Sequence, residues 1–315
     1  MQEVFLGEAI RKRRLALGLT QEQLCEGICE PITISRLENG KQTPSRNRIN
    51  ALLERLDMPA DRYFALLSRN ELELEALHKQ ITACNVRFFK ANRAEQAAIR
   101  EAALEAHREL EAIMEADDTI SRQLLLRSRV ILGKEDGPYS PAEQRAILLD
   151  AIRLTHPKFD PEEINLYLYT TDEIKIINQL ALTFAAEDDH LGAITIFRQL
   201  YNYIHKHFHN IPPIRAHLAM VALNYAQELV VSGQYRKTIE IAEEGRQICL
   251  DCGNHHSLPG LLAVTAEAYH FLGEDEKSRE IYIQVYYLSK AFGDCSGLEA
   301  TRADAKKYLN LEFPD

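Results

Sequence analysis

The segments Leu19-Thr20-Gln21-Glu22-Gln23-Leu24 and Ile34-Ser35-Arg36-Leu37-Glu38-Asn39-Gly40 indicate two short helices joined by a tight bend. Thr20 is followed three residues later by Gln23, which is the pattern of a capping box at a helix start. Ile34 and Leu37 lie at helical spacing and should face inward, and Gly40 stands where a glycine ends many helices. The second helix is therefore predicted to leave Thr33, Ser35 and Arg36 facing outward.

This helix pair resembles the helix-turn-helix of phage-repressor (Xre-like) proteins, in which the second helix enters the major groove of DNA. Arg36 can donate two hydrogen bonds to guanine, and Thr33 can contact a base edge or a thymine methyl. Side chains at the start of the first helix and after the second are candidates for phosphate contacts. The residues predicted to contact DNA are Gln21, Pro31, Ile32, Thr33, Ser35, Arg36, Asn39, Lys41, Thr43 and Arg46. A helix-turn-helix that contacts only protein is the alternative.

Charge is distributed unevenly along the chain. The 315 residues carry a formal net charge of −10, which by itself argues against binding nucleic acid. Residues 1–68, however, contain ten Lys or Arg and nine Asp or Glu, so the acidity lies in the remainder. A domain this weakly basic neutralises few phosphates, and two copies would double that number. We therefore expect a homodimer on a pseudo-palindromic operator in double-stranded DNA. The basic run at residues 11–14 fits DNA contact and a solvated helix face about equally well.

Composition and motifs exclude several classes of protein. The chain is 46% hydrophobic and 27% charged, as is typical of soluble globular proteins. No apolar run approaches the ~18 residues of a membrane span, and no signal peptide precedes the basic run, so we expect a cytoplasmic protein with no membrane partner. Phosphate-binding loops, zinc-protease and serine-hydrolase motifs and a dinucleotide fingerprint are absent, so we expect neither an enzyme nor a cofactor.

One cluster of cysteine and histidine permits a metal site. Cys249 and Cys252, with His255 and His256, have a spacing that a tetrahedral zinc site allows. Cys249 also belongs to an apolar helical stripe, and free cysteines are commonly buried. No second pair of cysteines completes the site, so the sequence favours a buried reduced thiol and no bound metal.

The chain divides into three predicted parts. Residues 1–68 form the helix-turn-helix domain, residues 69–82 a charged linker helix, and residues 83–315 a series of helical hairpins. The first domain has five short helices, with apolar positions Leu6, Ile10, Leu15 and Leu17 in the first and Tyr63, Phe64, Leu66 and Leu67 in the last.

The hairpins repeat with a recognisable pattern. The segment from Asn224 to Gly233 resembles the one that ends at Gly273, and a weaker copy includes Asn178. The two glycines are 40 residues apart, against a tetratricopeptide period of ~34, so these repeats are degenerate and carry longer loops. Stacked hairpins of this kind form a right-handed superhelix whose concave face suits an extended peptide. The predicted fold is therefore all-α.

Over nearly its full length the sequence resembles the peptide-sensing transcriptional regulators of Firmicutes, the PlcR/Rgg-like branch of the RRNPP family. The segments that carry the resemblance are residues 26–29, 34–40, 139–144, 155–157 and 173–179. The resemblance implies a homodimer in which each subunit joins an N-terminal helix-turn-helix to a tetratricopeptide-like domain. That domain would bind a short secreted signalling peptide after its re-import.

Two asparagines are the main candidates for holding such a peptide. Asn178 and Asn224 occupy matching places early in the first helix of two hairpins, and an amide offers both a donor and an acceptor to a peptide main chain. The alternative is that each bonds within its own repeat. Weaker candidates at neighbouring positions are Lys175, Gln179, Tyr225, Glu228 and Glu267.

The sequence thus predicts a quorum-sensing transcriptional regulator that binds DNA and is controlled by a peptide. Two alternatives stay open at this stage. The repeats could bind a partner protein, with the helix-turn-helix secondary, or the chain could be a prophage-type repressor without a peptide ligand.

Overall fold

The computed structural model describes residues 6–58, 69–134, 137–208, 212–253 and 255–314. Every helix or strand that could be assigned within these ranges proved to be a helix, and no strand is present there. This confirms the all-α prediction. The chain forms two compact units. The first unit comprises the described residues of Met1–Asn85 and Arg100–Leu180, and the second comprises those of Val86–Ile99, Ala181–Phe208 and Pro212–Asp315.

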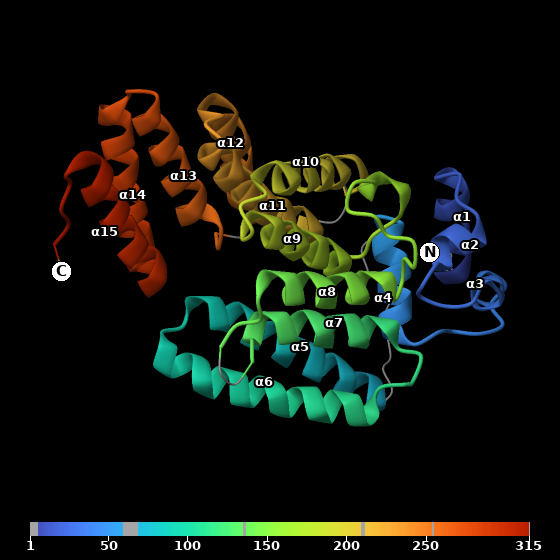
Figure 1. The fold of residues 1–315 in the computed structure, drawn as a ribbon. Coiled ribbons are helices and arrows are strands. Elements are labelled where there is room, and N and C mark those ends of the chain that lie inside the picture. Colours follow the sequence, from blue (N-terminus) through green and yellow to red (C-terminus); the bar gives the residue numbers. More distant parts are fainter. Residues whose placement is uncertain (1–5, 59–68, 135–136, 209–211, 254, 315) are drawn as a thin grey trace. The chain divides into compact units, whose positions relative to one another are not determined.

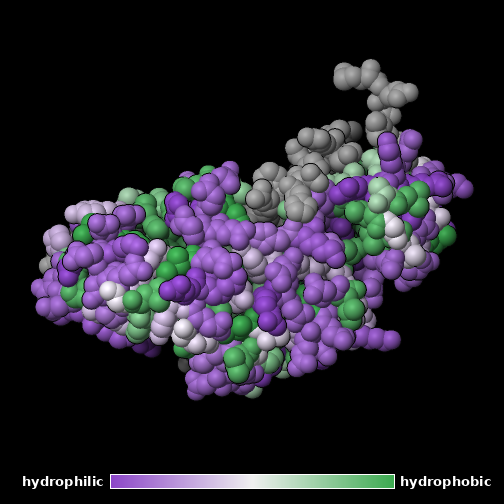
Figure 2. All heavy atoms as spheres, turned by 90° about the horizontal axis from the view of Figure 1, so that it is seen from above, coloured by the Kyte–Doolittle hydropathy of each residue, from purple (hydrophilic) through white to green (hydrophobic). Residues whose placement is uncertain are grey.

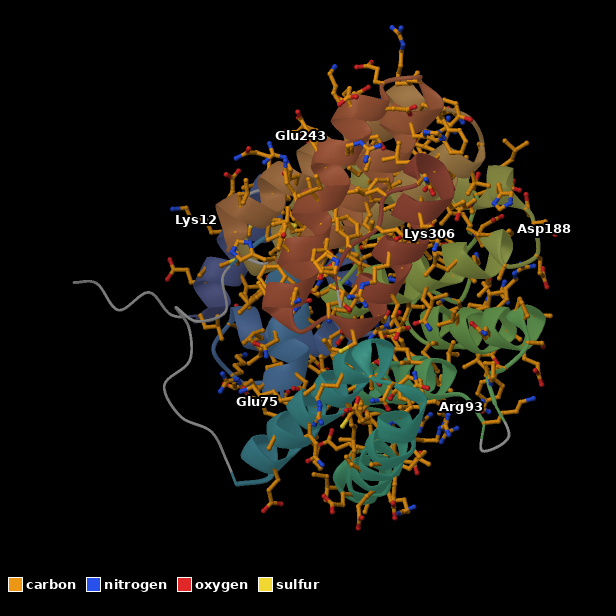
Figure 3. The ribbon with its side chains drawn as sticks, turned by 90° about the vertical axis from the view of Figure 1, so that its left-hand side faces the viewer. Lys12, Glu75, Arg93, Asp188, Glu243 and Lys306 are labelled. Atoms are coloured by element: carbon orange, nitrogen blue, oxygen red, sulfur yellow. The ribbon has the colours of Figure 1, made fainter. Side chains whose placement is uncertain are left out.

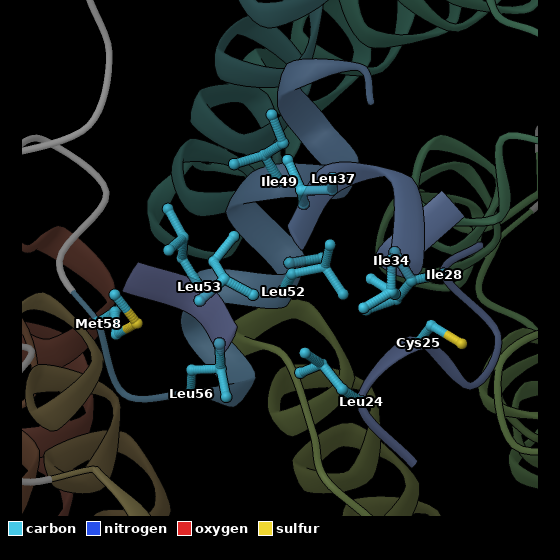
Figure 4. Packing of buried hydrophobic residues seen from close by; sticks show 12 residues of the cluster. Leu24, Cys25, Ile28, Ile34, Leu37, Ile49, Leu52, Leu53, Leu56 and Met58 are labelled. Carbon is cyan, nitrogen blue, oxygen red and sulfur yellow. The ribbon is translucent and has the colours of Figure 1, made fainter. Parts of the chain in front are cut away.

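The first unit begins with four short helices that enclose one apolar core (Figure 4). They are α1 (Leu6–Ala16), α2 (Gln21–Cys25), α3 (Pro31–Glu38) and α4 (Arg46–Arg55). Thr20 and Gln23 form the predicted capping box at the start of α2. Gly40 follows α3 with a φ of 69°, a conformation that glycine adopts without strain. The predicted fifth helix at Tyr63–Leu67 lies outside the described residues.

Helix α1 departs from its predicted pattern. Ile10 is buried, but Leu15 and Leu17 are 59% and 43% exposed. The inward position at the end of the helix belongs instead to Arg14, whose guanidinium bonds both carboxylate oxygens of Glu38 at 2.6 and 2.9 Å. Leu15 and Leu17, predicted as apolar positions of this helix, therefore lie outside the core, and Leu17 follows the end of α1.

The rest of the first unit is a layer of longer helices: α5 (Arg69–Lys90), α6 (Arg93–Ile113), α7 (Thr119–Leu132), α8 (Pro141–Arg153) and α9 (Thr171–Ala185), with a short η2 (Ile164–Leu166) (Figure 1). Helices α5, α6 and α9 continue into the second unit. The core of this layer joins Leu77 and Ile81 of α5 to Leu110 of α6 and Leu124 of α7. Helix α5 starts where the linker helix was predicted and runs eight residues past position 82.

The second unit holds α10 (His190–His207), α11 (Pro212–Val231), α12 (Tyr235–Cys252), α13 (Leu258–Phe271), α14 (Asp275–Phe292) and α15 (Cys295–Leu309). From α11 onward each helix packs on the next, and α13 also contacts α11 and α15, so that alternate helices form one layer (Figure 1). Gly233 and Gly273 close two of the hairpins with φ values of 74° and 80°. The predicted repeat is thus present in the backbone as a tetratricopeptide-like array.

Small residues set the spacing within this array. A Cβ added at Gly245 of α12 would lie 2.9 Å from Ala222 Cβ of α11 and 2.9 Å from Leu261 Cδ2 of α13. These distances are shorter than ordinary side-chain packing allows, so only glycine permits this approach of three helices.

The face of the molecule drawn in Figure 2 is mostly polar. Hydrophilic residues cover most of the face seen in Figure 2, and apolar residues occur there as separate patches. Within the described residues, no helix combines the length and the apolar character that crossing a bilayer requires.

Candidate nucleic-acid interface and repeat surfaces

Helix α3 presents one narrow face to solvent. Its N-terminal residue is Pro31, and its inward positions Ile34 and Leu37 are buried in the core of Figure 4. Ile32, 56% exposed, begins an outward stripe that continues through Arg36 and Asn39 at helical spacing. The helix therefore offers an apolar side chain, a guanidinium and an amide along one line.

Buried polar contacts fix the orientation of α3. Glu38, at the end of the helix, accepts hydrogen bonds from Arg14 and, at 2.8 Å, from the side chain of Gln21. Asn39 donates to the carbonyl of Ser35 at 2.7 Å and so closes the last turn. Gln21 and Ser35, two predicted DNA contacts, thus also help to position the helix that carries the others.

The basic residues near α3 differ in their exposure and in their contacts within the domain. Arg36 is exposed and donates one hydrogen bond of 3.4 Å to Gln42, a residue that the sequence alone did not single out. Lys41 and Thr43 are exposed, whereas Arg46 is half-buried and lies 3.6 Å from Glu75 of α5. The remaining predicted contacts that are half-buried are Gln21, Pro31, Thr33 and Ser35.

The basic run of α1 serves two purposes. Arg14 pairs with Glu38, and Arg13 donates to the carbonyl of Leu56 at 2.9 Å, so both stabilise the domain. Arg11 and Lys12 are exposed, and Lys12 projects from the surface in Figure 3. Only these two of the four remain candidates for outside contact.

A buried ionic cluster joins α4 to the helical layer of the first unit. Arg55 Nη1 donates to the carbonyls of Leu24 and Glu26 at 3.0 and 2.7 Å. Its Nη2 lies 3.5 Å from Oε1 of Glu173 and 3.3 Å from Nε2 of His156. The guanidinium and carboxylate side chains are at most 1% exposed. One arginine therefore holds the bend of the helix-turn-helix and the start of α9 at once.

This cluster controls the ionisation of Glu173. Burial by itself raises the pKa of this carboxyl, but the charge of Arg55 and the hydrogen bonds of His156 and Thr155 outweigh it and lower the pKa to about 2. The group is therefore ionised at neutral pH although it is fully enclosed.

Close backbone contacts reinforce the same junction. Gly27, in the bend between α2 and α3, has a φ of 69°, and a Cβ there would lie 2.1 Å from Cα of Thr155. Thr119 Oγ1 donates to the carbonyl of Gly27 at 2.7 Å, and Glu54 accepts from the backbone N–H of Thr171 at 2.8 Å. Three segments that carry the family resemblance, residues 26–29, 155–157 and 173–179, meet here.

The peptide candidates on α9 belong to the first unit. Asn178 is buried, and Lys175 bonds the carboxylate of Asp172 at 2.9 Å. Oε1 of Gln179 is buried and accepts no hydrogen bond from the described residues. Asn178 is thus enclosed by the fold, Gln179 is half-buried, and Lys175 is held by an ion pair on its own helix.

The other candidates belong to the second unit. Asn224 is half-buried on α11. Tyr225 is buried against the ring of Tyr201, and Glu228 is buried with His190 Nδ1 at 2.8 Å from its carboxylate. Tyr225 and Glu228 are therefore committed to contacts within the unit, and Asn224 is the least buried of the three.

A cavity of about 290 Å³ opens on the layer formed by α11, α13 and α15. Leu223 and Gln227 of α11 line it, together with Glu267 of α13, which accepts a hydrogen bond from Tyr308 at 2.6 Å. Its other polar lining includes Ser289 and Asp304, which the sequence did not single out. No local motif marks either residue, because the cavity exists only once three hairpins are stacked.

A second cavity, of about 420 Å³, lies among α12, α13 and α14. Glu243 and Arg246 line it and bond each other, with Nε of Arg246 2.8 Å from a carboxylate oxygen. Glu243 stands on the outer surface of α12 in Figure 3. The mutual pairing leaves this cavity without an unmatched charge.

The cysteine cluster near the end of α12 gives a buried thiol at Cys249. That side chain is completely enclosed, and burial raises its pKa to about 11. The ring of His255 stacks on that of Phe292 with centroids 6.4 Å apart. Cys249 is therefore a neutral packing residue at neutral pH.

Comparison with known proteins identifies the helix-turn-helix by its sequence and the whole chain by its fold. Residues 10–62 match the HTH_3 family, described as helix-turn-helix. No curated protein matches the sequence significantly. Among solved structures, Bacillus thuringiensis PlcR in complex with the peptide PapR7 and DNA has 18% identity and a TM-score of 0.57, with 94% of this chain and 98% of that chain covered. PlcR in its apo form has 16% identity, a TM-score of 0.55, and coverage of 94% and 97%.

The competence regulator ComR from Streptococcus vestibularis, in complex with its cognate signaling peptide XIP, has 12% identity and a TM-score of 0.52, with 96% and 97% of the two chains covered. Likeness at such identities establishes a shared fold. The expected resemblance is confirmed at this level: an Xre-type helix-turn-helix followed by tetratricopeptide-like repeats over nearly the whole chain.

Proposed function

We propose that this chain, which joins an Xre-type helix-turn-helix domain to the fold shared by PlcR and ComR, is a cytoplasmic transcriptional regulator controlled by a short peptide. The observation that carries the DNA-binding part is the outward stripe of α3, because its inward face is locked by Arg14, Gln21 and Glu38. A recognition helix must hold its base-reading side chains in a fixed orientation, and the contacts of Glu38 support this role by fixing the helix that carries Arg36.

In this proposal Arg36 reads a base, and residues that follow α3 contact the phosphate backbone of the DNA. The exposed guanidinium can bond both acceptors of a guanine in the major groove. Lys41 and Thr43, also exposed, contact phosphates on either side. Because one domain is nearly neutral, a homodimer binds two half-sites about one helical turn apart, or a multiple of it.

The DNA part is tested with three variants of the full chain. Arg36→Ala should weaken operator binding by about 1–3 kcal/mol and relax preference at one position in each half-site. Lys41→Ala should weaken binding to all sequences and flatten the dependence on salt. Arg93→Ala removes an exposed cation outside the helix-turn-helix domain and should change neither property. Unchanged operator preference in Arg36→Ala would remove the base-reading role.

Asn224 and the cavity on α11, α13 and α15 support the peptide part. Asn224 is half-buried on α11 and directly follows Leu223, which lines the cavity. An extended peptide of about five to ten residues could exchange main-chain hydrogen bonds with this amide as a strand would. Asn178 has the equivalent place on α9 but is buried, so this proposal assigns the main-chain contact to Asn224.

The peptide part is tested by calorimetric titration with peptides encoded by short reading frames beside the gene. Asn224→Ala should weaken binding by about 1–3 kcal/mol, because a desolvated main-chain partner is left unpaired. Its thermal stability without peptide should stay close to that of the wild type. Equal affinity for both proteins would exclude Asn224 from the site, and loss of folding would support a structural role instead.

Peptide binding controls DNA binding through a population shift in this proposal. A peptide that prefers one arrangement of the repeats favours that arrangement and changes the spacing of the two helix-turn-helix domains in a dimer. The Arg55–Glu173 contact supports such coupling within the first unit, because the start of α9 and the helix-turn-helix bend share one buried arginine. Sedimentation should give about twice the chain mass of 36.0 kDa. A monomer both alone and on the operator contradicts the mechanism.

A further inference from the structure

The cavity on α11, α13 and α15 has an acidic lining. Three carboxylates face it, from Glu267, Asp294 and Asp304, and none of the described residues that line it is Lys or Arg. Asp294 already accepts the backbone N–H of Gly297 at 3.0 Å, as the N-cap of α15. Glu267 accepts one hydrogen bond from Tyr308. Neither Glu267 nor Asp304 bonds another residue of this lining, and Asp304 accepts no hydrogen bond from any of the described residues.

The surroundings of Asp304 disfavour its negative charge. Burial and the charge of Glu267 raise the pKa of Asp304, and the nearby ammonium of Lys307 opposes this only in part. Lys307 itself donates to the phenol oxygen of Tyr308 at 2.9 Å. Two half-buried acids therefore share one side of the cavity with incomplete compensation, which favours a further positive charge.

A buried hydroxyl in the same cavity lacks a partner. Ser289 of α14 is 1% exposed, lines the cavity, and its Oγ forms no hydrogen bond with the described residues. Buried hydroxyls in folded proteins almost always have a partner, and a helical serine commonly uses the carbonyl of the preceding turn. This unmet capacity in a cavity that two carboxylates also line indicates a group that arrives from outside the chain.

We propose that this cavity is a specificity subsite that takes a lysine or arginine side chain of the bound peptide. The inference rests on the proposed peptide control. The aliphatic stem of the side chain would pack on Leu223, Val264 and Val285, which also line the cavity. The cationic head would bond Asp304, Glu267 and the hydroxyl of Ser289. A volume of about 290 Å³ suits one such side chain.

Charge complementarity is what separates this subsite from a general apolar groove. An ammonium or guanidinium supplies only donors, and all three proposed partners accept. Norleucine, which has the stem of lysine without the charge, would leave two carboxylates desolvated and unpaired. The subsite should therefore select strongly for the cation and reject an acid.

The test uses the full chain and synthetic heptapeptide pools. Each pool has one position fixed as Lys, Arg, norleucine or Glu and the other six randomised, and thermal shift is measured for every pool. The best Lys or Arg pool, resolved to a single peptide, should bind at least about tenfold more tightly than its norleucine counterpart. Asp304→Asn should reduce this ratio to about twofold, whereas Glu280→Gln, an exposed acid of α14, should preserve it.

The outcomes separate the subsite from the proposed function. Asp304→Asn relieves repulsion and should melt no lower than the wild type; if it fails to fold, Glu267→Gln is measured in the same way. Binding that prefers norleucine or Glu pools, or a lysine preference that survives Asp304→Asn and Glu267→Gln, overturns the subsite and leaves peptide control intact. No shift with any pool contradicts peptide control itself, and the subsite falls with it.

Discussion

Replacing Glu173 by glutamine should lower the free energy of unfolding by about 3 kcal/mol at neutral pH. The substitution keeps the size of the side chain and an oxygen that can accept from Thr155, which now donates to Glu173 at 2.5 Å. It removes the one negative charge that lies 3.5 Å from Nη2 of Arg55. Because Arg55 is completely buried, its charge has no water to replace the lost partner.

The magnitude follows from the ionisation of Glu173 in the fold. Its pKa falls from an ordinary value of 4.5 to about 2, through Arg55, His156 and Thr155 acting against burial. At about 1.4 kcal/mol for each pH unit, this depression is worth about 3 kcal/mol. Removing one member of a buried ion pair typically costs about 3–5 kcal/mol, which agrees.

The assay is urea unfolding of the wild type, Glu173→Gln and the exposed control Glu280→Gln. A carboxyl whose pKa is lowered in the fold stabilises above its unfolded value and loses that contribution as pH falls toward the folded one. The difference in free energy of unfolding between wild type and Glu173→Gln should therefore have its full value at pH 7 and should decrease between about pH 4.5 and 2. The reasoning is refuted if Glu173→Gln loses less than about 1 kcal/mol at pH 7, or if the control Glu280→Gln loses as much.

Two further predictions concern the same junction. Burial raises the pKa of Glu54 to about 7, so folding disfavours its ionised form and stability falls as pH rises from about 4.5 to 7. Glu54→Gln can still accept the hydrogen bond from Thr171. Its free energy of unfolding should exceed that of the wild type by about 1–3 kcal/mol at pH 8 and equal it at pH 4. Equal melting temperatures for variant and wild type at pH 8 as well as at pH 4 would count against this prediction. Gly27→Ala should lose about 2–5 kcal/mol, because positive φ and the backbone of Thr155 both oppose a Cβ. Gly253→Ala, with a φ of 65° and nothing within 4 Å of its Cβ, should lose only about 1–2 kcal/mol, and similar losses for both glycines would contradict the close approach.

The amino-acid sequence by itself determined the local features of this protein. The capping box of Thr20 and Gln23, the inward positions Ile34 and Leu37, and the turn at Gly40 were all predicted and are present. Each is a preference expressed within one or two turns of helix, where backbone hydrogen bonding and side-chain spacing decide the outcome. The equivalence of Gly233 and Gly273 belongs to the same class, because a tight hairpin requires a positive φ at one position.

Tertiary structure alone decided which polar groups are enclosed. Arg55 meets His156 across 101 residues of sequence, and Glu54 meets the backbone of Thr171 across 117. Leu15 and Leu17 belong to the same set of predicted apolar positions as Ile10, yet they are exposed, and Arg14 is buried in their place through its pair with Glu38. The cavity of Ser289 and Asp304 likewise exists only when hairpins stack. Burial of a charge depends on partners far along the chain, and a local pattern holds no information about them.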